Sequence, residues 1–469
     1  MGRTIWWIRR DLRLFDNQAL KAALNHSNQV IPVFILDERL IKRYSGNKRL
    51  SFLFGGLQKL NQNLQQKGGH LILRRGPARR SLLELLRETG AEAIYAEEDY
   101  SPYARLRDEN IQRELPLRLV SGTAILPPGS VLKPDGDPYT VFTPFSRAWM
   151  NQMVACSEGI SPAPERINTP ENINSEDIDA LIEANQSPWF LPGETEGKRR
   201  LQAFIEGGES ALVYHYYEGR NFLDVDGTSK ISPYLRFGML SPKVVARLAL
   251  TTIQNAPNTA ARKSAETWLN ELIWREFYIH ILYHFPRVRN ENFRQMDIRW
   301  EDNEDKFNAW REGQTGYPIV DAAMRQLRET GWMHNRGRMI VASFLTKDLL
   351  IDWRWGEEWF MKLLVDGDPA ANNGGWQWTA GTGTDAAPYF RIFNPTSQSQ
   401  KFDPKGKYIR RWVPELMNVP DEFIHEPWKM PAGVQNKVGV KIGKDYPHPI
   451  IDHHWARTRA LDVYGKAKP

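Results

Sequence analysis

The chain has 469 residues, of which 41% are hydrophobic and 25% are charged. This composition is typical of folded globular proteins, and the length is enough for two or three domains. A net charge of +6 permits a polyanionic partner without demanding one. No run of about 18 apolar residues occurs, which excludes an ordinary membrane-spanning helix. The single cysteine, Cys156, excludes an internal disulfide, disfavours a cysteine-rich metal site and fits a cytoplasmic protein.

Short β-branched or aromatic runs alternate with amphipathic helical patterns in the first part of the chain. The strand-like runs begin at Thr4, Gln29, His70, Ala91 and Leu117, and helical patterns cover residues 50–66 and 80–89. This alternation predicts a parallel, doubly wound α/β domain over residues 1–132. No G-x-G-x-x-G fingerprint follows the first strand, so a dinucleotide-binding Rossmann domain has no support.

The middle of the chain, from about Met150 to Gly197, is rich in Pro, Asn, Ser and Glu and has no sustained period. We therefore expect residues 133–197 to form a long interdomain connector. Helical patterns then cover residues 198–206, 241–255, 264–284, 318–330 and 335–351, without a comparable strand signal. The sequence thus predicts an α/β domain followed by an all-α domain over residues 198–469.

One stretch, residues 366–395, combines acids, amides, glycines, indoles and arginine without a hydrophobic period. Gly374 and Gly375 would let the backbone approach a ligand closely. The carboxylates, amides and indoles around them suit a flat heterocycle with polar edges. A glycine-rich turn between two helices is the alternative interpretation.

Five blocks carry a resemblance to the photolyase/cryptochrome superfamily, and in particular to microbial class I cyclobutane pyrimidine dimer photolyases. They are residues 6–17 (WWIRRDLRLFDN), 227–232 (GTSKIS), 268–278 (WLNELIWREFY), 315–336 (TGYPIVDAAMRQL to TGWMHNR) and 366–395. The resemblance implies light-driven repair of pyrimidine dimers in DNA, with FAD as catalytic cofactor. A signalling cryptochrome and a light-independent flavoprotein that binds DNA are the alternatives.

The resemblance also implies where FAD binds. The GTSKIS segment would cradle its phosphates, although such a run alone is usually a turn or a helix cap. Arg338 and Asp366 would form an ion pair beside the flavin ring. Asn372 would face flavin N5, where a neutral amide favours reduced, anionic FAD and repair rather than signalling. The implied cofactor-binding set is Tyr216, Thr228, Ser229, Lys230, Ile231, Ser232, Arg275, Arg338, Asp366, Gly367, Asp368 and Asn372.

Trp268, Glu271, Arg275 and Tyr278 recur at spacings of three and four, so they share one helix face. An intrahelical Glu271–Arg275 ion pair with aromatic packing is the structural alternative. The resemblance implies instead that Arg275 contacts the cofactor phosphates and that Glu271 hydrogen-bonds the damaged bases. Trp274, which flanks this face, would also meet the substrate.

Asn335 and Met339 share a helix face and match the substrate pocket of dimer-specific enzymes, where (6-4) photolyases have two histidines. The basic and aromatic run over residues 401–412 supplies charge suited to a DNA backbone, although most charge runs are solvated surfaces. The implied substrate-binding and DNA-binding set is Arg220, Glu271, Trp274, Arg336, Trp378, Arg391, Gln398 and Lys401.

Seventeen tryptophans are more than packing alone calls for. Trp300, Trp353 and Trp376 match the indole chain that conducts an electron to the excited flavin, although each alone could be a packing residue. The implied catalytic set is Glu271, Asn335, Met339, Asn372, Trp376, Trp353 and Trp300, and no metal is expected.

The antenna chromophore of the α/β domain is predicted from residues 99–108, DYSPYARLRD. Tyr103 and Ala104 stand where folate-binding relatives have Asn and Glu, so the resemblance favours 8-hydroxy-5-deazaflavin. Methenyltetrahydrofolate, a second flavin and an empty pocket remain alternatives. The expected partner is dimer-containing DNA, bound by a monomer without a membrane or an obligatory protein partner.

Overall fold

The computed structural model describes residues 2–39, 46–155, 159–177 and 189–467. The chain forms two compact units, and each is assembled from segments that lie far apart in the sequence. The first unit contains Met1–His215, Ser229–Pro286 and Val365–Ala370. The second contains Tyr216–Thr228, Arg287–Leu364 and Ala371–Pro469. The consecutive domain boundaries expected after residues 132 and 197 stay predictions.

A five-stranded parallel sheet forms the centre of the α/β part of the first unit, in the order β3-β2-β1-β4-β5. Its strands are β1 Arg3–Ile8, β2 Gln29–Leu36, β3 Ile72–Arg75, β4 Ala93–Glu97 and β5 Leu117–Val120. Their apolar side chains are buried, as expected for a parallel sheet with helices on both faces. The structure confirms the predicted doubly wound α/β fold.

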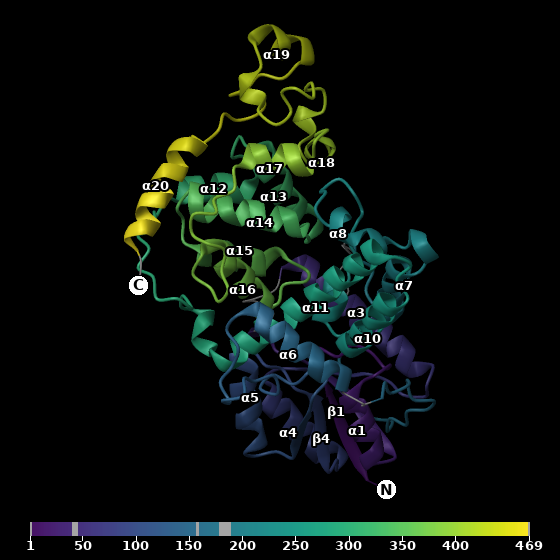
Figure 1. The fold of residues 1–469 in the computed structure, drawn as a ribbon. Coiled ribbons are helices and arrows are strands. Elements are labelled where there is room, and N and C mark those ends of the chain that lie inside the picture. Colours follow the sequence, from purple (N-terminus) through teal and green to yellow (C-terminus); the bar gives the residue numbers. More distant parts are fainter. Residues whose placement is uncertain (1, 40–45, 156–158, 178–188, 468–469) are drawn as a thin grey trace. The chain divides into compact units, whose positions relative to one another are not determined.

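The helices of the first unit cover this sheet and extend beyond it (Figure 1). They are α1 Gln18–His26, α3 Asn47–Gln65, α4 Ala78–Thr89, α5 Pro102–Gln112, α6 Phe142–Ala155, α7 Glu194–Ile205, α9 Ser232–Arg236, α10 Pro242–Gln254 and α11 Thr259–His284. Helix α6 lies inside the segment expected to be a connector. Its Phe142 and Phe145 pack on Trp274 and Phe277 of α11, so tertiary packing stabilises a helix that the sequence pattern did not reveal.

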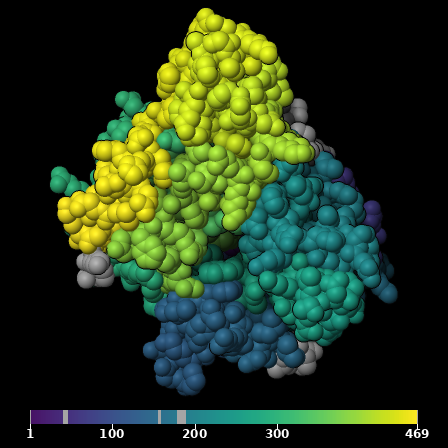
Figure 2. All heavy atoms as spheres, turned by 45° about the horizontal axis from the view of Figure 1, so that its top comes forward, coloured from purple at the N-terminus to yellow at the C-terminus, as the bar shows by residue number. Residues whose placement is uncertain are grey.

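The second unit is helical, which confirms the predicted all-α part of the fold. Its helices are α8 Tyr216–Gly219, α12 Glu304–Glu312, α13 Pro318–Thr330, α14 Asn335–Ser343, α15 Trp353–Leu363, most of α16 Pro369–Ala380, α17 Pro395–Phe402, α18 Lys407–Trp412, α19 Ala432–Val438 and α20 His453–Lys466. A large apolar core rich in aromatic rings joins α12 to α18. Figure 2 shows the chain from α17 onward, in yellow-green and yellow, as one continuous surface.

The helix predicted over residues 335–351 is interrupted. Helix α14 ends at Ser343 and continues as a π-helical turn, Phe344–Asp348. Leu350 then adopts a left-handed conformation with φ of 55°, and Asp352 caps α15 by accepting a hydrogen bond from the Arg354 N–H. A left-handed residue ends a helix, which a hydrophobic period does not reveal. No helix in the described part of the chain is long and apolar enough to cross a membrane.

Candidate active site and nucleic-acid interface

The predicted site residues divide between the two units. Residues 229–232, 271–275 and 366–368 belong to the first unit, and the remaining predicted residues belong to the second. Arg338 and Asp366 therefore lie in different units, and their expected ion pair stays a prediction. The two groups of residues are described separately below.

Helix α11 carries three of the predicted site residues of the first unit, Glu271, Trp274 and Arg275. Its N-terminus is capped by Asn258, whose side chain accepts a hydrogen bond from the Ala261 N–H. Arg275 donates to Glu276 Oε1 at 2.8 Å and to the Thr123 carbonyl at 2.9 Å. The ion pair of Arg275 is thus made with its neighbour Glu276, and the alternative of a Glu271–Arg275 pair is wrong.

Glu276 is a residue that the sequence reasoning missed. It is buried, and its Oε2 accepts hydrogen bonds from the backbone N–H groups of Ile125 and Leu126, at 2.8 and 3.2 Å. Burial raises the pKa of Glu276, and the adjacent Arg275 opposes that rise. Adjacent residues lie on different helix faces, so the face-sharing rule gave no signal for this pair.

Trp274 stacks on Phe142, with ring centroids 3.7 Å apart and planes at 1°. One face of the indole is therefore covered by α6. Its edge also contacts Phe277 at 5.7 Å. The ring is held rigidly, and a substrate contact would have to use what remains of its surface.

The acidic residues at the start of the 366–395 stretch contact two largely buried arginines. Asp366 accepts a hydrogen bond from Ser232 Oγ at 2.7 Å, and Asp368 pairs with Arg10 at 2.5 Å. Arg236 lies 3.8 Å from Asp368 and donates to the Gly367 carbonyl at 2.7 Å. Burial lowers the pKa of Arg236 to about 9, with repulsion from Arg10 as a smaller cause. Arg10 and Arg236 were not among the predicted site residues.

The GTSKIS segment has the backbone geometry of an anion-binding nest. Lys230 is left-handed, with φ of 50°, and Ile231 follows with φ of −89° and ψ of −1°. Such alternation turns successive backbone N–H groups toward one point, and Ser232 then begins α9. This geometry, together with the buried arginines, fits the diphosphate of a dinucleotide such as FAD.

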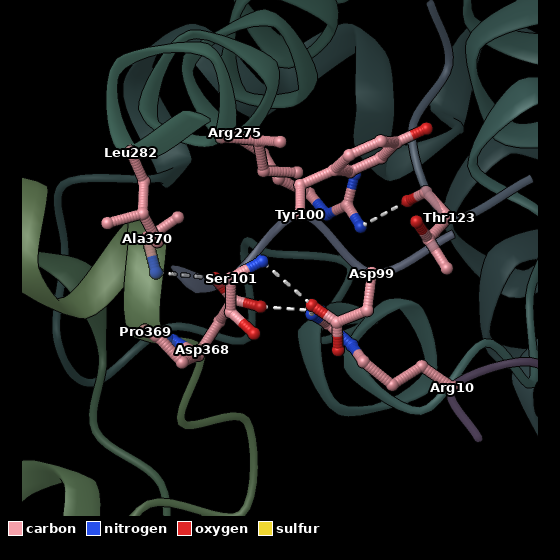
Figure 3. A pocket seen from close by; sticks show the side chains of 11 residues that line it. Arg10, Asp99, Tyr100, Ser101, Thr123, Arg275, Leu282, Asp368, Pro369 and Ala370 are labelled. Atoms are coloured by element: carbon pink, nitrogen blue, oxygen red, sulfur yellow. Dashed lines mark hydrogen bonds and ion pairs between the residues drawn. The ribbon is translucent and has the colours of Figure 1, made fainter. Parts of the chain in front are cut away.

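A small pocket lies in the first unit (Figure 3). The sheet order reverses between β1 and β4, and in such sheets ligands bind beyond the carboxyl ends of the strands at this switch point. Arg10 follows β1, and residues 99–101 follow β4. Burial alone would raise the pKa of Asp99, but Arg10 and the Ser101 N–H help to lower it to about 2. The pocket is lined by Arg10, Asp99, Tyr100, Ser101, Thr123, Arg275, Ile279, Leu282, Asp368, Pro369 and Ala370.

In the second unit, the first turn of α14 brings three predicted residues together. The Met339 sulfur lies 3.9 Å from Asn335 Nδ2 and 3.8 Å from Arg336 Nη1. His334, the residue before the helix, accepts a hydrogen bond from the Arg336 N–H through its Nδ1 at 3.1 Å. His334 is thus the N-cap of α14 and has a structural role.

Arg336 is held by Asn221, which the sequence reasoning missed, and by Phe402 of the predicted basic and aromatic run. Its Nη2 donates to Asn221 Oδ1 at 2.5 Å, and its guanidinium lies 4.3 Å from the centre of the Phe402 ring. Lys401 lies 5.4 Å from the same ring. Arg220, next to Asn221, lies over the Tyr216 ring at 5.3 Å. The structure therefore gathers three of the predicted DNA-contacting cations around aromatic rings in one unit.

The predicted DNA contacts differ in exposure. Arg391 and Lys401 are exposed, whereas Trp378 and Gln398 are half-buried. The Gln398 side-chain oxygen has no hydrogen-bond partner among the described residues. Trp378 accepts backbone hydrogen bonds from Gly381 and Ala387, which fix the chain after α16.

The three tryptophans of the predicted electron chain share one core. Trp353 and Trp376 are buried in it, and Trp300 packs against it. Each has ring or polar contacts to other residues rather than to the next indole of the chain. Trp376 contacts Trp310 and Phe360, Trp353 Nε1 donates to Asn292 at 2.9 Å, and Trp300 contacts Tyr464.

Asn372 has a defined orientation on α16. Its Nδ2 donates to the Glu357 carbonyl at 2.9 Å, and the Glu357 carboxylate is itself held by Arg289 at 2.6 Å. One of the two Nδ2 hydrogens is therefore used within the unit. The Oδ1 atom remains as a hydrogen-bond acceptor, with no bond to the described residues.

An α/β unit with a dinucleotide-compatible cradle, and a helical unit with an aromatic core and a cationic face, define the photolyase/cryptochrome class of flavoproteins. Residues 4–167 match the DNA photolyase family, and residues 268–466 match the FAD binding domain of DNA photolyase. The chain is 41% identical to a curated deoxyribodipyrimidine photo-lyase of Agrobacterium fabrum, covering 99% of this chain and 98% of the relative. It belongs to the DNA photolyase family.

Two solved structures share the whole fold. A bacterial class III photolyase from Agrobacterium tumefaciens matches with a TM-score of 0.90 and 39% identity, covering 100% of this chain and 98% of that one. A cryptochrome from Synechocystis matches with a TM-score of 0.89 and 31% identity, covering 99% of each chain. The fold is thus shared by repair and cryptochrome relatives, and the class I assignment within the family stays a prediction.

Proposed function

We propose that this chain uses light to repair cyclobutane pyrimidine dimers in DNA. Its full-length similarity to a deoxyribodipyrimidine photo-lyase supports this reaction rather than cryptochrome signalling. The observation that carries the proposal is the first turn of α14. There Asn335 and Met339 stand beside Arg336, so an amide, a thioether and a cation are offered together. This combination suits a pyrimidine dimer next to a phosphate.

The catalytic cofactor is FAD, which when reduced and excited supplies the electron that splits the dimer. The nest at Lys230 and Ile231, with Ser232, would bind its phosphates through backbone N–H groups. Tyr216, Thr228, Arg275, Arg338 and the residues 366–368 complete the proposed binding set. The Asn372 Oδ1 would accept a hydrogen bond from N5–H of reduced flavin, because its Nδ2 is already bonded to Glu357.

The chain's own residues position the substrate and exclude water. Glu271 would hydrogen-bond the carbonyl and imide groups of the dimer and stabilise the negative charge that the dimer gains. Trp274 and Trp378 would offer aromatic surface to the extruded bases. Trp376, Trp353 and Trp300 would deliver an electron that resets the cofactor to its reduced state.

For the antenna chromophore we propose 8-hydroxy-5-deazaflavin in the pocket at the β1/β4 switch point. Tyr100 and the apolar Ile279 and Leu282 supply surface for a flat ring, and Ser101 and Thr123 supply hydroxyl groups for its polar edge. Chromatography of extracted chromophores tests this directly. A deazaflavin would support the proposal, whereas a folate, a second flavin or no second chromophore would overturn it.

We further propose that the enzyme is a cytoplasmic monomer, and that Arg220, Arg336, Arg391, Gln398 and Lys401 contact DNA. Light scattering of the purified chain with and without dimer-containing DNA would test the stoichiometry. A one-to-one complex is expected, and a stable dimer of the free chain would contradict the proposal.

The decisive experiment follows the absorption spectrum of the purified protein under blue light with a reductant, and then assays DNA containing a thymine dimer. We expect a flavin spectrum that bleaches and a light-dependent loss of the dimer. Bleaching without repair would point to a signalling protein.

Glu271→Ala tests the role of the carboxylate. We expect a lower quantum yield of repair with unchanged flavin content. Glu266→Ala is the matched control, because Glu266 is an exposed residue of the same helix that pairs with Arg262. An unchanged yield in Glu271→Ala would remove Glu271 from the mechanism.

A further inference from the structure

Asn221 is fixed in one orientation at the surface of the second unit. Its Nδ2 faces the backbone carbonyls of Tyr217 and Glu218 at 3.3 and 3.4 Å, near the end of the short helix α8. Its Oδ1 is thereby turned outward and accepts the 2.5 Å hydrogen bond from Arg336. The amide thus links the segment that carries Arg220 to the first turn of α14.

Arg336 keeps its charge in this arrangement. Its partners among the described residues are the Asn221 amide, the Phe402 ring and the Met339 sulfur, and none of them is a carboxylate. Burial lowers the pKa of Arg336, and the neighbouring Arg220 lowers it further. A neutral acceptor orients the guanidinium without neutralising it, so the cation remains available to a phosphate.

The orientation of Arg336 also bears on Met339. Methionine has three rotatable side-chain bonds and fills irregular spaces, so a defined thioether position needs external contacts. Here the sulfur lies between the Asn335 amide and the Arg336 guanidinium, at 3.9 and 3.8 Å. A guanidinium that rotated away would leave the thioether with one of its two polar contacts.

We propose that Asn221 is a positioning residue that orients Arg336 and, through it, the Met339 thioether, and that it thereby sets the preference for a pyrimidine dimer over undamaged DNA. This inference rests on the proposed function, because it assumes that the α14 turn meets the dimer. Asn221 itself need not touch the substrate.

The test compares Asn221→Ala and Asn221→Asp with the unaltered holoenzyme. The dissociation constants for one duplex with and without a thymine dimer are measured in the dark, and repair kinetics are then measured under blue light. For Asn221→Ala we expect the dimer preference to fall about tenfold, as for loss of one hydrogen bond to a charged group. The KM should rise while kcat for bound dimer stays unchanged.

Asn221→Asp separates orientation from charge. Its carboxylate still holds Arg336, so the dimer preference should be retained. Both DNAs should bind more weakly, because the added negative charge opposes phosphate. If Asn221 had only a structural role, both variants would lower the melting temperature. The loss of dimer preference in Asn221→Ala and the general loss of DNA affinity in Asn221→Asp would then not be separated.

Asn418→Ala is the matched control, since Asn418 is an exposed asparagine of the same unit. Asn221→Ala that keeps the full dimer preference would overturn the inference, as would Asn221→Asp that loses it. If the unaltered holoenzyme itself shows no dimer preference and no repair, the proposed function fails instead.

Discussion

At the scale of single residues, buried charges in this protein are held by specific partners rather than by solvent. Glu276 is an example, because its Oε1 pairs with Arg275 and its Oε2 accepts hydrogen bonds from two backbone N–H groups. Removing one member of such a group leaves the others buried and unsatisfied, which costs more free energy than the interaction itself contributes.

Two substitutions of Glu276 should therefore lower the free energy of unfolding by different amounts. Glu276→Gln keeps an acceptor for the backbone and should lower the free energy of unfolding by about 1–3 kcal/mol. Glu276→Ala leaves Arg275 without its carboxylate and both N–H groups without an acceptor, and should cost about 3–5 kcal/mol. Urea denaturation of the two variants measures the difference. Equal losses would show that the backbone hydrogen bonds contribute little.

Lys230 gives a second prediction at this scale. Its left-handed backbone is easy for glycine and strained for a β-branched residue. Lys230→Gly should retain flavin, because the proposed contact uses backbone N–H groups. Lys230→Val should lose about 1–2 kcal/mol of stability and release flavin on dilution. Flavin fluorescence after gel filtration measures retention, and flavin loss from Lys230→Gly would assign the contact to the lysine side chain.

At the scale of elements, different parts of α11 carry residues with different roles. One part carries Glu271, Trp274 and Arg275, and its last turns carry the buried His280 and the half-buried His284. The rings of His280 and His284 lie 4.5 Å apart, and the His280 ring packs on Phe145 at 5.0 Å. Burial lowers the pKa of His280 to about 4, and the adjacent His284 contributes.

This pair predicts how stability depends on pH. Above the ordinary histidine pKa, His280 is neutral in both folded and unfolded chains and contributes nothing. As the pH falls from about 6.5 to about 4, His280 becomes protonated in the unfolded chain but stays neutral in the folded chain. The free energy of unfolding therefore decreases by about 3 kcal/mol over this range. His280→Phe should remove most of this loss, whereas His215→Gln, at an exposed position, should not. Thermal melts across this pH range provide the measurement.

At the scale of the whole molecule, the net charge is modest, but cations are concentrated in one region. Arg220, Arg336 and Lys401 are associated with aromatic rings in the second unit, although the whole chain carries only +6. Aromatic rings hold cations in place while leaving their charge intact. Such a surface suits a phosphate backbone better than the average composition suggests.

The salt dependence of DNA binding tests this distribution. Each phosphate contact adds about 0.9 to the slope of log affinity against log salt concentration. Lys401→Ala should reduce the slope by about 1 and weaken damaged and undamaged DNA alike. Lys21→Ala, which removes an exposed charge from α1 of the first unit, should leave the slope unchanged. An unchanged slope for Lys401→Ala would remove Lys401 from the interface.

The sequence by itself determined the two kinds of architecture in this chain, because hydrophobic periods of two and 3.6 residues distinguish strands from helices. It predicted the five strands and seven of the helices, α3, α4, α7, α10, α11, α13 and α14, and family-like blocks marked Glu271, Asn335 and Arg275 as predicted site residues. It did not reveal α6, whose Phe142 and Phe145 need α11 to pack against, or the π-helical turn after Ser343.

Only the tertiary structure decided which partners these residues have. Helical spacing offered Glu271 as an alternative partner for Arg275, whereas in the structure Arg275 contacts Glu276 and the Thr123 carbonyl. Arg336 is held by Asn221, more than a hundred residues away. Local spacing specifies a helix face, but contacts between distant segments depend on how the helices pack, and no local pattern encodes that packing.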